Sequence, residues 1–348
     1  MKKPVLAILA FVLLFLALAF GWTWYRDNRV SNFGRTAEIY VRPGDSASGV
    51  FETVCAAAAV KDRRSLERSF RNKKVAANLK PGHYTVSPGD ASVYVARMFN
   101  NGWQTPVRLT LAGNLRIKQN IAAKISSQML VDSASVYQAL CDDALLGKFG
   151  FSSRNAFSLL MPATYEIWWT AGPEDIFRKM KEAWDAFWTP DNDAKAAALG
   201  LSREEVSVLA SIVKAESNYE PEMPLIAGVY LNRLAVGMPL QADPTVAFCF
   251  DYKPQRILHK HLEVDSPYNT YRHPGLPPGP ICVPSRAALE AVLNPDFGGV
   301  RGKGNFYFCA NPDFSGKHIF ARTLSEHNAN ARAFQAELTR RARAKRGQ

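Results

Sequence analysis

The amino-acid sequence predicts an α+β protein that an N-terminal transmembrane helix attaches to a membrane. Three observations carry this prediction. A long apolar segment comes first, short β-like runs then alternate with helices, and the middle of the chain reads mostly as helix. The 348 residues suffice for this anchor and for two or three domains.

The anchor is predicted in residues 1–25. Its uncharged segment from Pro4 to Trp24 has 21 residues, which as a helix span about 31 Å, the thickness of a hydrocarbon core. Lys2 and Lys3 precede it, so we expect a cytoplasmic start, one pass through the cytoplasmic (inner) membrane and all later domains on the periplasmic side. A cleaved signal peptide is the alternative, because Ala17-Leu18-Ala19 fits a cleavage site. The apolar segment runs past that site, which favours a retained anchor.

The charge of the chain limits its partners. It carries 43 Lys and Arg against 31 Asp and Glu, a net charge of +12. Nucleic acid is the usual partner of so basic a protein, but an exported position favours anionic lipids or cell-wall carboxylates instead. The five cysteines and six histidines show no metal-ligand spacing, so we expect neither a metal nor another cofactor.

Residues 26–35 are predicted to be a short polar linker, and residues 36–105 a small α+β domain. A pattern of β-like run, Pro-Gly-Asp turn and helix occurs there twice, in residues 38–60 and 82–101. The first copy, VRPGDSASGVF, resembles the opening of a LysM glycan-binding module. The alternative is a small α+β spacer that lifts the rest of the chain from the membrane.

Residues 106–200 are predicted to form a helical connecting subdomain. It begins with a third β-like run at 107–111 and a helix at 117–127, and breaks are expected at 161–165 and 189–191. Four tryptophans crowd this region: Trp168, Trp169, Trp184 and Trp188. They could stack on sugars, but amphipathic helices bury such side chains more often, so we expect them in the core.

Residues 201–345 form the last predicted domain, and Glu216 is its most informative residue. Ser202 and Glu205 form an S-x-x-E capping box that begins a helix, and the apolar face of this helix ends in Glu216. A buried carboxylate is costly unless it is paired or kept protonated. Only ~0.2% of an ordinary Glu is protonated at pH 7, and raising its pKa by ~2 units costs about 2.7 kcal/mol. A protonated carboxyl near neutral pH suits a general acid. The alternative is a structural glutamate that binds a backbone N–H or an Arg.

Two further segments of this domain are expected to shape a site. A helix at 225–234, closed by Gly237, leads to the Asp243–Pro244 step, which is expected to hold Asp243 in an extended backbone. The segment 269–281 contains four prolines and two glycines. We expect it to be a stiff irregular loop that presents polar groups.

Together these segments resemble the endolytic murein transglycosylases, the YceG-like family. The matching motifs, in chain order between Leu209 and Asn328, are LASIVKAES, YLNRLAVGMPLQADPTV, NTYRHPGLPPGPI, LNP and ARTLSEHN. The resemblance implies non-hydrolytic cleavage of the MurNAc–GlcNAc β-1,4 bonds inside peptidoglycan strands, which leaves 1,6-anhydro-N-acetylmuramic acid ends. The catalytic glutamate of the family matches Glu216. A mixed α+β catalytic domain with a helix-borne catalytic glutamate is therefore implied for residues 201–345.

The chain departs from the family at two positions. Relatives usually carry an acid two residues before the catalytic glutamate, where this chain has Lys214. They also carry a Pro-Glu-Gly turn, where this chain has Leu111-Ala112-Gly113. Lys214 lies about 200° around a helix from Glu216, so we expect it to point away from the site.

The implied mechanism uses Glu216 twice. The protonated carboxyl donates to the bridging oxygen, and the carboxylate then takes the proton of the muramic C6 hydroxyl, which attacks the anomeric carbon. The candidates for binding sugar and peptide groups are Ser217, Gln241, Asp243, Thr245, Asn269 and Tyr271. A purely structural role is the alternative for each of them. Peptidoglycan strands, the inner membrane and, as a candidate, a peptidoglycan synthase are the expected partners.

Three other functions stay open, ranked here behind the transglycosylase. A lysozyme-type hydrolase would use Asp243 as a second carboxylate, at about 5–5.5 or 6.5–9.5 Å from Glu216. A non-catalytic wall-binding scaffold would recruit synthases. A binder of nucleic acid or lipid would act through the basic tail Arg340–Arg346 and would bind in a steeply salt-dependent way.

Overall fold

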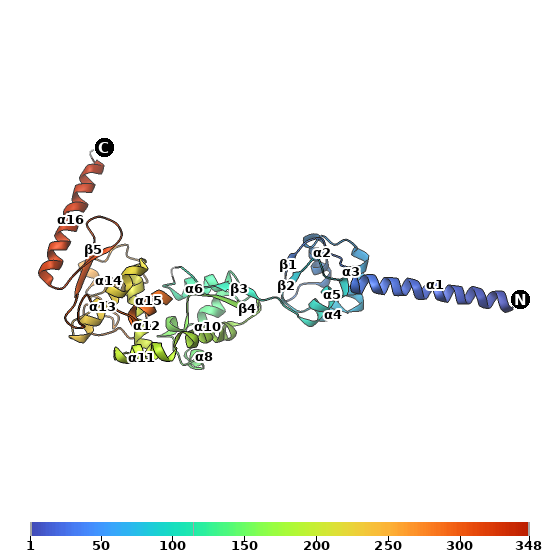
Figure 1. The fold of residues 1–348 in the computed structure, drawn as a ribbon, viewed down its shortest axis with the longest axis horizontal. Coiled ribbons are helices and arrows are strands. Elements are labelled where there is room, and N and C mark those ends of the chain that lie inside the picture. Colours follow the sequence, from blue (N-terminus) through green and yellow to red (C-terminus); the bar gives the residue numbers. More distant parts are fainter. Residues whose placement is uncertain (1, 114, 347–348) are drawn as a thin grey trace. The chain divides into compact units, whose positions relative to one another are not determined.

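The structure, a computed structural model, describes residues 2–113 and 115–346, without the side chains of residues 2–4 and 345–346. The predicted cytoplasmic start rests on the charges of Lys2 and Lys3, whose side chains are not among those described. The chain divides into two compact units (Figure 1). The first unit consists of the chain up to Leu109 together with Gln128–Leu130 and Glu166–Ala171. The second unit consists of Thr110–Ser127, Val131–Tyr165 and the chain from Gly172 onward.

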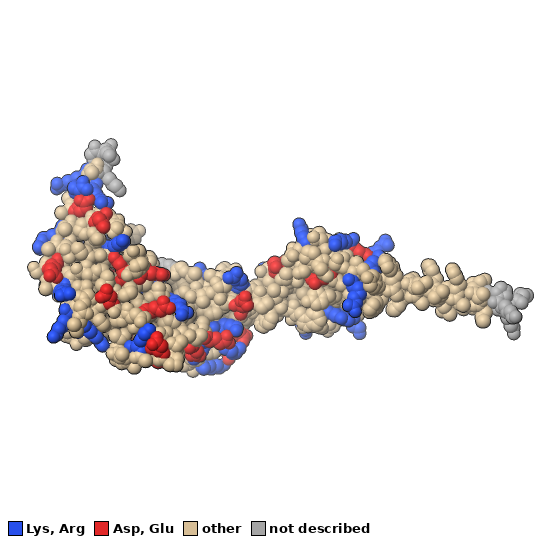
Figure 2. Space-filling model, viewed as in Figure 1, with Lys and Arg blue, Asp and Glu red and all other residues tan. Residues whose placement is uncertain are grey.

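Helix α1, Lys2–Arg29, is the first element of the first unit. Its part Val5–Arg29 contains an 18-residue window with a mean hydropathy of 2.8. Apolar side chains are exposed along it, and its visible face carries no charged residue over most of its length (Figure 2). By length and composition α1 could cross a membrane, as predicted. Which side of a membrane each end faces stays a prediction.

Residues 26–35 do not form the expected polar linker. Helix α1 continues to Arg29, and Asp27 is buried against helix α3 (Arg63–Asn72). The Asp27 carboxylate accepts hydrogen bonds from Ser65 (2.6 Å) and Arg68 (2.7 Å). The chain that follows α1 then enters the core of this unit. A polar run can be buried when its charges are paired, and composition alone does not reveal the partner.

A small antiparallel sheet organises the first unit. Strands β1 (Ala37–Val41) and β2 (Gly82–Val86) pair in a register that places Ile39 opposite Tyr84, and both of these side chains are buried. The helices around it are α2 (Ala47–Ala57), α3, α4 (Val75–Asn78) and α5 (Ser92–Asn101). Both strands and helices α2 and α5 lie where the sequence predicts them. The likeness of this unit to a LysM module stays a prediction.

Two helices of the first unit escape the sequence patterns. The buried side of α3 includes only two large apolar residues, Leu66 and Phe70, and α4 is four residues long. The apolar residues of α3 share one face but are few, and α4 is too short to show a helical period, so both helices depend on tertiary packing. Helix α5 ends as predicted, because Gly102 adopts a φ of 71° as its C-cap.

The first part of the second unit is mostly helical, as predicted. Its helices are α6 (Lys118–Ser126), α7 (Ser133–Ala139), α8 (Asp143–Gly147), α9 (Ala156–Leu159), α10 (Pro173–Phe187) and α11 (Pro190–Ala198). The expected break at 161–165 runs into a strand, β4 (Thr164–Ile167), which pairs with β3 (Val107–Thr110). Strand β3 lies where the sequence predicts it, whereas β4 begins inside the expected break and is not predicted. Trp169, Trp184 and Trp188 are buried, which confirms the core interpretation for these three, whereas Trp168 is exposed and the interpretation is wrong for it.

The rest of the second unit carries the helix that ends in Glu216. Helix α12 (Arg203–Glu216) begins with the predicted capping box of Ser202 and Glu205. It packs against α13 (Met223–Ala235) and α15 (Arg286–Leu293). The remaining elements are η1 (Glu220–Glu222), α14 (Asp243–Cys249), η2 (His259–His261), β5 (Tyr307–Ala310), β6 (His318–Ala321) and α16 (Leu324–Arg346).

The backbone around Asp243 differs from the expectation. Asp243 begins helix α14, and the extended residue is its N-cap, Ala242. Pro244 lies in the first turn of α14, where backbone N–H groups have no carbonyl partner within the helix. The N–H that proline lacks therefore costs no hydrogen bond, and the proline favours a helix start at this point. The segment 269–281 is irregular, as predicted. Gly237 follows the C-cap of α13 with a φ of 68°.

Helix α16 carries part of the basic excess of the chain (Figure 2). Arg340 and Arg341 both bind Glu337, at 2.7 Å. Both arginine side chains are exposed, so this helix resembles an ordinary charged surface helix rather than a dedicated binding arm.

Helix α13 approaches a neighbouring loop without room for a side chain at Gly228. A Cβ at this position would overlap the carbonyl oxygen of Asp296 and lie 3.0 Å from the Cα of Phe297. Both obstacles are backbone atoms, which cannot turn aside as a flexible side chain would. The tight contact fixes the loop against α13.

We expect Gly228→Ala to lower the free energy of unfolding by about 3 kcal/mol, because the methyl group forces α13 and this loop apart. Gly147→Ala is the matched control, since a Cβ at Gly147 meets nothing within 4 Å, and we expect it to be neutral or to stabilise by up to about 1 kcal/mol. Urea denaturation of the detergent-solubilised chain measures both. Equal stability of the two variants would show that α13 and the loop are not in tight contact.

Candidate active site

Glu216 is the last residue of α12. Ser217 ends the helix with extended backbone angles, φ −141° and ψ 143°, and its N–H bonds to the carbonyl of Val213 at 3.2 Å. The C-terminus of a helix carries the negative end of the helix dipole. A negative charge is therefore disfavoured at this position, and the neutral acid is favoured.

The Glu216 carboxyl is held by one hydroxyl. Tyr230 of α13, itself buried, donates to Oε1 at 2.6 Å. Glu216 keeps partial contact with solvent, but protein surrounds its carboxyl, and this burial raises the pKa of Glu216 to about 7. The Tyr230 hydrogen bond lowers this pKa, the charge of Asp243 raises it, and the charge of Arg233 lowers it. Roughly half of the Glu216 carboxyls are thus protonated at neutral pH.

Arg233 lies near this carboxyl, but its hydrogen bonds go to the backbone. Its guanidinium donates to the carbonyls of Phe306 (2.7 Å) and Leu240 (2.6 Å), and it lies 5.3 Å from the ring centre of Tyr307. Within residues 2–113 and 115–346, no cation forms an ion pair with Glu216. The structure therefore does not support the alternative in which Glu216 is paired with an arginine.

A pocket of about 320 Å³ opens onto the Glu216 carboxyl. Six segments supply its lining: the end of α12, the second half of α13, the loop into α14, the irregular loop at 269–281, β5 and the start of α16. The lining residues are Glu216, Tyr230, Arg233, Leu240, Gln241, Asp243, Tyr271, Tyr307, Phe308, Leu324 and His327. A pocket of this size accommodates a small part of a polymer rather than a large ligand.

Three of the six candidate binding residues line this pocket: Gln241, Asp243 and Tyr271. Gln241 and Asp243 are exposed, and the Tyr271 hydroxyl donates to Oδ1 of Asp243 at 2.6 Å. Gln241 has a φ of 49°, which non-glycine residues rarely adopt, and its N–H bonds to the carbonyl of Thr270 at 3.1 Å. The backbone is thus strained at the point where the Gln241 side chain enters the pocket.

The other three candidates are buried and occupied by internal hydrogen bonds. Thr245 donates to the carbonyl of Ala242 (2.7 Å), and the Asn269 amide donates to the carbonyls of Leu262 (2.8 Å) and Val264 (2.9 Å). The Ser217 hydroxyl accepts the N–H of Tyr219 at 3.0 Å. These groups hold the loops around the pocket in place, so we assign them a structural role.

Several residues of the pocket are absent from the sequence prediction. Tyr230 and Arg233 lie three residues apart on α13 and so share one face. A polar pair on one face of an otherwise apolar helix is the sequence signal that could have predicted them. Tyr307 and His327 stack with ring centres 5.4 Å apart, but they come from β5 and α16, and no local pattern links those segments. Lys214 points elsewhere, as expected, and binds Oδ1 of Asn218 at 2.8 Å.

The chain is similar to proteins of known family along most of its length. The family model of the YceG-like family matches residues 39–333. An endolytic murein transglycosylase of Bacillus subtilis is 27% identical over 313 residues, which cover 84% of this chain and 83% of that protein. An endolytic murein transglycosylase of Streptococcus pneumoniae is 26% identical over 364 residues. The match covers 94% of this chain but only 64% of the streptococcal protein.

A solved structure agrees with the sequence comparisons. The crystal structure of a YceG-like protein from Listeria monocytogenes aligns with a TM-score of 0.56 and 26% identity, over 85% of this chain and 98% of the listerial chain. The family match spans the segments that supply Glu216, Tyr230, Asp243 and Tyr271. On these grounds, this chain belongs to the YceG-like family.

Proposed function

We propose that this protein is a membrane-anchored endolytic murein transglycosylase and that Glu216 is its catalytic acid and base. One observation carries the proposal. The Glu216 carboxyl has a pKa raised to about 7 by burial, is not ion-paired among the described residues, and faces an open pocket. The similarity to endolytic murein transglycosylases supports the same conclusion. Peptidoglycan is the proposed substrate.

The proposed reaction needs a carboxyl that can both give and take a proton. Protonated Glu216 donates its proton to the oxygen that bridges MurNAc and GlcNAc, and the C1–O bond of MurNAc breaks. The Glu216 carboxylate then removes the proton from the C6 hydroxyl of the same MurNAc, and this oxygen bonds to C1. The products are a 1,6-anhydro-MurNAc end and a GlcNAc end with a free 4-hydroxyl. Glu216 returns to its protonated state, and no water is consumed.

The groups around Glu216 suit the two halves of this cycle. A carboxyl with a pKa near the working pH loses and regains a proton at little cost. The Tyr230 hydroxyl stabilises the carboxylate that exists after the first proton transfer. The nearby negative charge of Asp243 both raises the pKa of Glu216 and favours the positive charge that develops at C1 when the glycosidic bond breaks.

Gln241, Asp243 and Tyr271 are the proposed contacts to the sugar. Their polar groups line the pocket beside Glu216, and the first two are exposed. The hydrogen bond from Tyr271 to Asp243 fixes both side chains relative to each other. A sugar hydroxyl could therefore meet groups already in position, which reduces the entropy lost on binding.

A lysozyme-type hydrolase is the second candidate, and the structure gives it a specific basis. Asp243 lines the same pocket as Glu216 and influences its pKa, so a second carboxylate is close. Such an enzyme would have to activate a water or form a covalent sugar intermediate through Asp243. We favour the transglycosylase because one Oδ of Asp243 already binds Tyr271 and because the similar proteins are named as transglycosylases. The products distinguish the two, as described next.

We expect Glu216→Gln to reduce cleavage of purified sacculi by about 10²- to 10⁴-fold, because an amide can neither donate nor accept the proton. Glu204→Gln is the matched control: it makes the same substitution on the same helix at an exposed position, and it should keep wild-type activity. Mass spectrometry of the wild-type products should show anhydro ends. Ends heavier by one water would contradict the transglycosylase, and an active Glu216→Gln variant would contradict the role of Glu216.

We expect kcat/KM of the wild type to fall as the pH rises through about 7, because only protonated Glu216 can start the reaction. Tyr230→Phe removes a hydrogen bond that lowers the pKa of Glu216, so the fall should move to higher pH, by about one unit. A pH profile of both proteins on one glycan substrate measures this. An unchanged profile would show that the Tyr230 hydroxyl does not act on the group that titrates.

We propose that α1 spans the membrane and holds the other domains on the periplasmic side. The full-length protein should then stay in the membrane fraction after washes with high salt and with alkaline carbonate, because the helix is retained by apolar burial rather than by charge. Protease added outside spheroplasts should digest the second unit. Release by salt alone would instead indicate attachment through the basic surface.

A further inference from the structure

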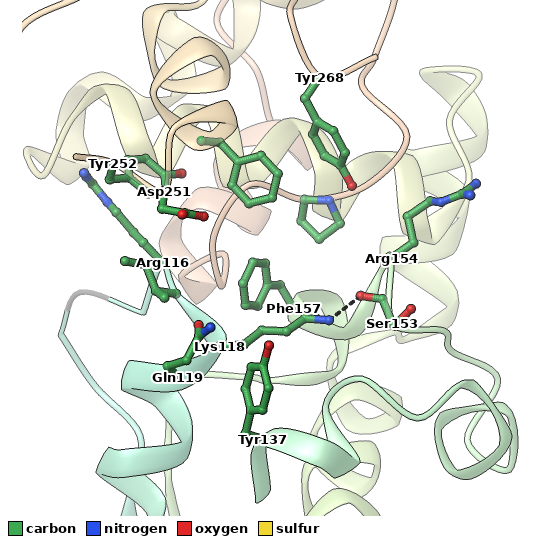
Figure 3. A pocket seen from close by; sticks show the side chains of 13 residues that line it. Arg116, Lys118, Gln119, Tyr137, Ser153, Arg154, Phe157, Asp251, Tyr252 and Tyr268 are labelled. Carbon is green, nitrogen blue, oxygen red and sulfur yellow. Dashed lines mark hydrogen bonds between the residues drawn. The ribbon is translucent and has the colours of Figure 1, made fainter. Parts of the chain in front are cut away.

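A second cavity, of about 220 Å³, lies in the second unit and shares no lining residue with the Glu216 pocket. Figure 3 shows this cavity, which we call the basic cavity. The start of α6, a tyrosine of α7, the segment before α9, the end of α14 and the irregular loop supply its lining. Five segments that lie far apart in the sequence thus meet around one hollow.

Three cations line the basic cavity: Arg116, Lys118 and Arg154. The Lys118 ammonium donates to the backbone carbonyls of Ser153 (2.7 Å) and Leu140 (2.8 Å), and it also contacts the sulfur of Cys141 at 4.0 Å. Within the described ranges 2–113 and 115–346, none of the three cations forms an ion pair with a carboxylate. Asp143 lies outside the lining and acts electrostatically on Lys118 and Arg154 without an ion pair to either, so the described lining keeps an excess of positive charge.

The other groups of the basic cavity do not cancel this charge. Asp251 is the acid among its described lining residues, and its carboxylate binds Lys253 at 3.1 Å. Asp251 and the next lining residue, Tyr252, both have a positive φ, 52° and 56°. Two consecutive strained residues persist only where the surrounding structure holds them. Tyr252 is fixed by its hydroxyl, which donates to the carbonyl of Ile281 at 2.7 Å.

Aromatic side chains complete the walls. In Figure 3 the hydroxyl ends of Tyr137 and Tyr268 are directed toward the hollow, and Phe157 lies at its centre beside Lys118. The Arg116 guanidinium lies 5.0 Å from the ring centre of Tyr252. Cations with tyrosine hydroxyls bind a carboxylate, and the rings give apolar contact to the chain that carries it. The volume fits one or two amino-acid residues rather than a whole large ligand.

Helix α14 connects the basic cavity to the Glu216 pocket. Asp243, its first residue, lines the pocket, and Phe248, near its last turn, lines the cavity. Five residues of α-helix rise about 7.5 Å. An extended peptide covers that distance with two or three residues. A peptide attached to a sugar beside Glu216 is thus long enough to place an acidic group in the basic cavity.

We infer that the basic cavity binds a carboxylate of the stem peptide that peptidoglycan carries on its muramic acid residues. This inference rests on the proposed function, since it places a substituted muramic acid beside Glu216. Stem peptides carry free carboxylates on their acidic residues and at their C-terminus. The cavity makes the protein select glycan strands that still bear peptides with free carboxylates.

The test compares three glycan substrates with the full-length protein in detergent. The first carries stem peptides with free carboxylates, the second carries the same peptides with their carboxylates amidated, and the third has lost its peptides to an amidase. We expect the wild type to show a KM about tenfold lower for the first substrate than for the second, because a charge-assisted hydrogen bond is lost on amidation.

Variants then locate the effect. The double variant Arg116→Gln, Arg154→Gln should bring the ratio of the two KM values close to one. The matched control is Arg178→Gln, a solvated arginine of α10 outside both pockets, which should keep the tenfold ratio. Arg154→Gln alone repeats the test if the double variant melts at a lower temperature, because Arg154 is exposed and its loss should not affect folding. Equal ratios in the wild type, the double variant and the control would overturn the inference.

Direct binding separates this inference from the proposed function. A fluorescent free stem peptide should bind the full-length wild type and lose about tenfold in affinity with the double variant. If the wild type cleaves no substrate but this binding pattern holds, the transglycosylase fails and the cavity remains a peptide site. If the peptide does not bind and inorganic pyrophosphate binds in an Arg116-dependent way, the cavity takes phosphate and the inference is overturned.

Discussion

The hydrogen bond from Tyr230 to Glu216 is the interaction on which this site depends. It lies at the C-terminal end of α12 in partly buried surroundings, where a negative charge is disfavoured. Burial alone would keep the carboxyl neutral and useless as a base. The hydroxyl of Tyr230 opposes that effect, and the balance leaves the pKa of Glu216 at about 7. A single carboxyl can then serve as acid and base at neutral pH.

Helix α13 holds the rest of the pocket around this bond. Gly228 lets the loop after α15 approach its backbone, and Asn232 bonds to that loop through the carbonyl of Asn305 (2.8 Å) and the N–H of Gly302 (2.7 Å). Arg233 bonds to the carbonyls before β5 and α14. Because its guanidinium is occupied in this way, Arg233 supplies structure to the pocket and leaves Glu216 without an ion pair. Tyr230, on the same helix, is held facing the carboxyl.

The sequence predicts the local features of this protein well. The capping box of α12, the position of Glu216 at the end of that helix, the glycine at Gly102 and the strands β1 and β2 all follow from short-range patterns, and the structure contains them. Each depends on residues only a few positions apart, where backbone geometry determines the outcome.

The sequence does not predict what depends on contacts between distant segments. Thr245 and Asn269 are polar and lie in promising motifs, but they are buried and hold loops together. Tyr230 reaches Glu216 only because α12 and α13 pack side by side. Asp27 is buried because Arg68 is available 41 positions later. Burial and pairing of this kind are tertiary properties, which periodicity cannot reveal.

The most direct test of this account is a measurement of the protonation of Glu216 itself. The protein would be labelled with ¹³C at the side-chain carboxyls of glutamate, and the Glu216 resonance would be assigned by its absence in Glu216→Gln. The account predicts that this resonance titrates with a pKa of about 7. A resonance that titrates near 4.5, the ordinary value for glutamate, would contradict it, because the carboxyl would then be ionised at neutral pH and unable to donate a proton.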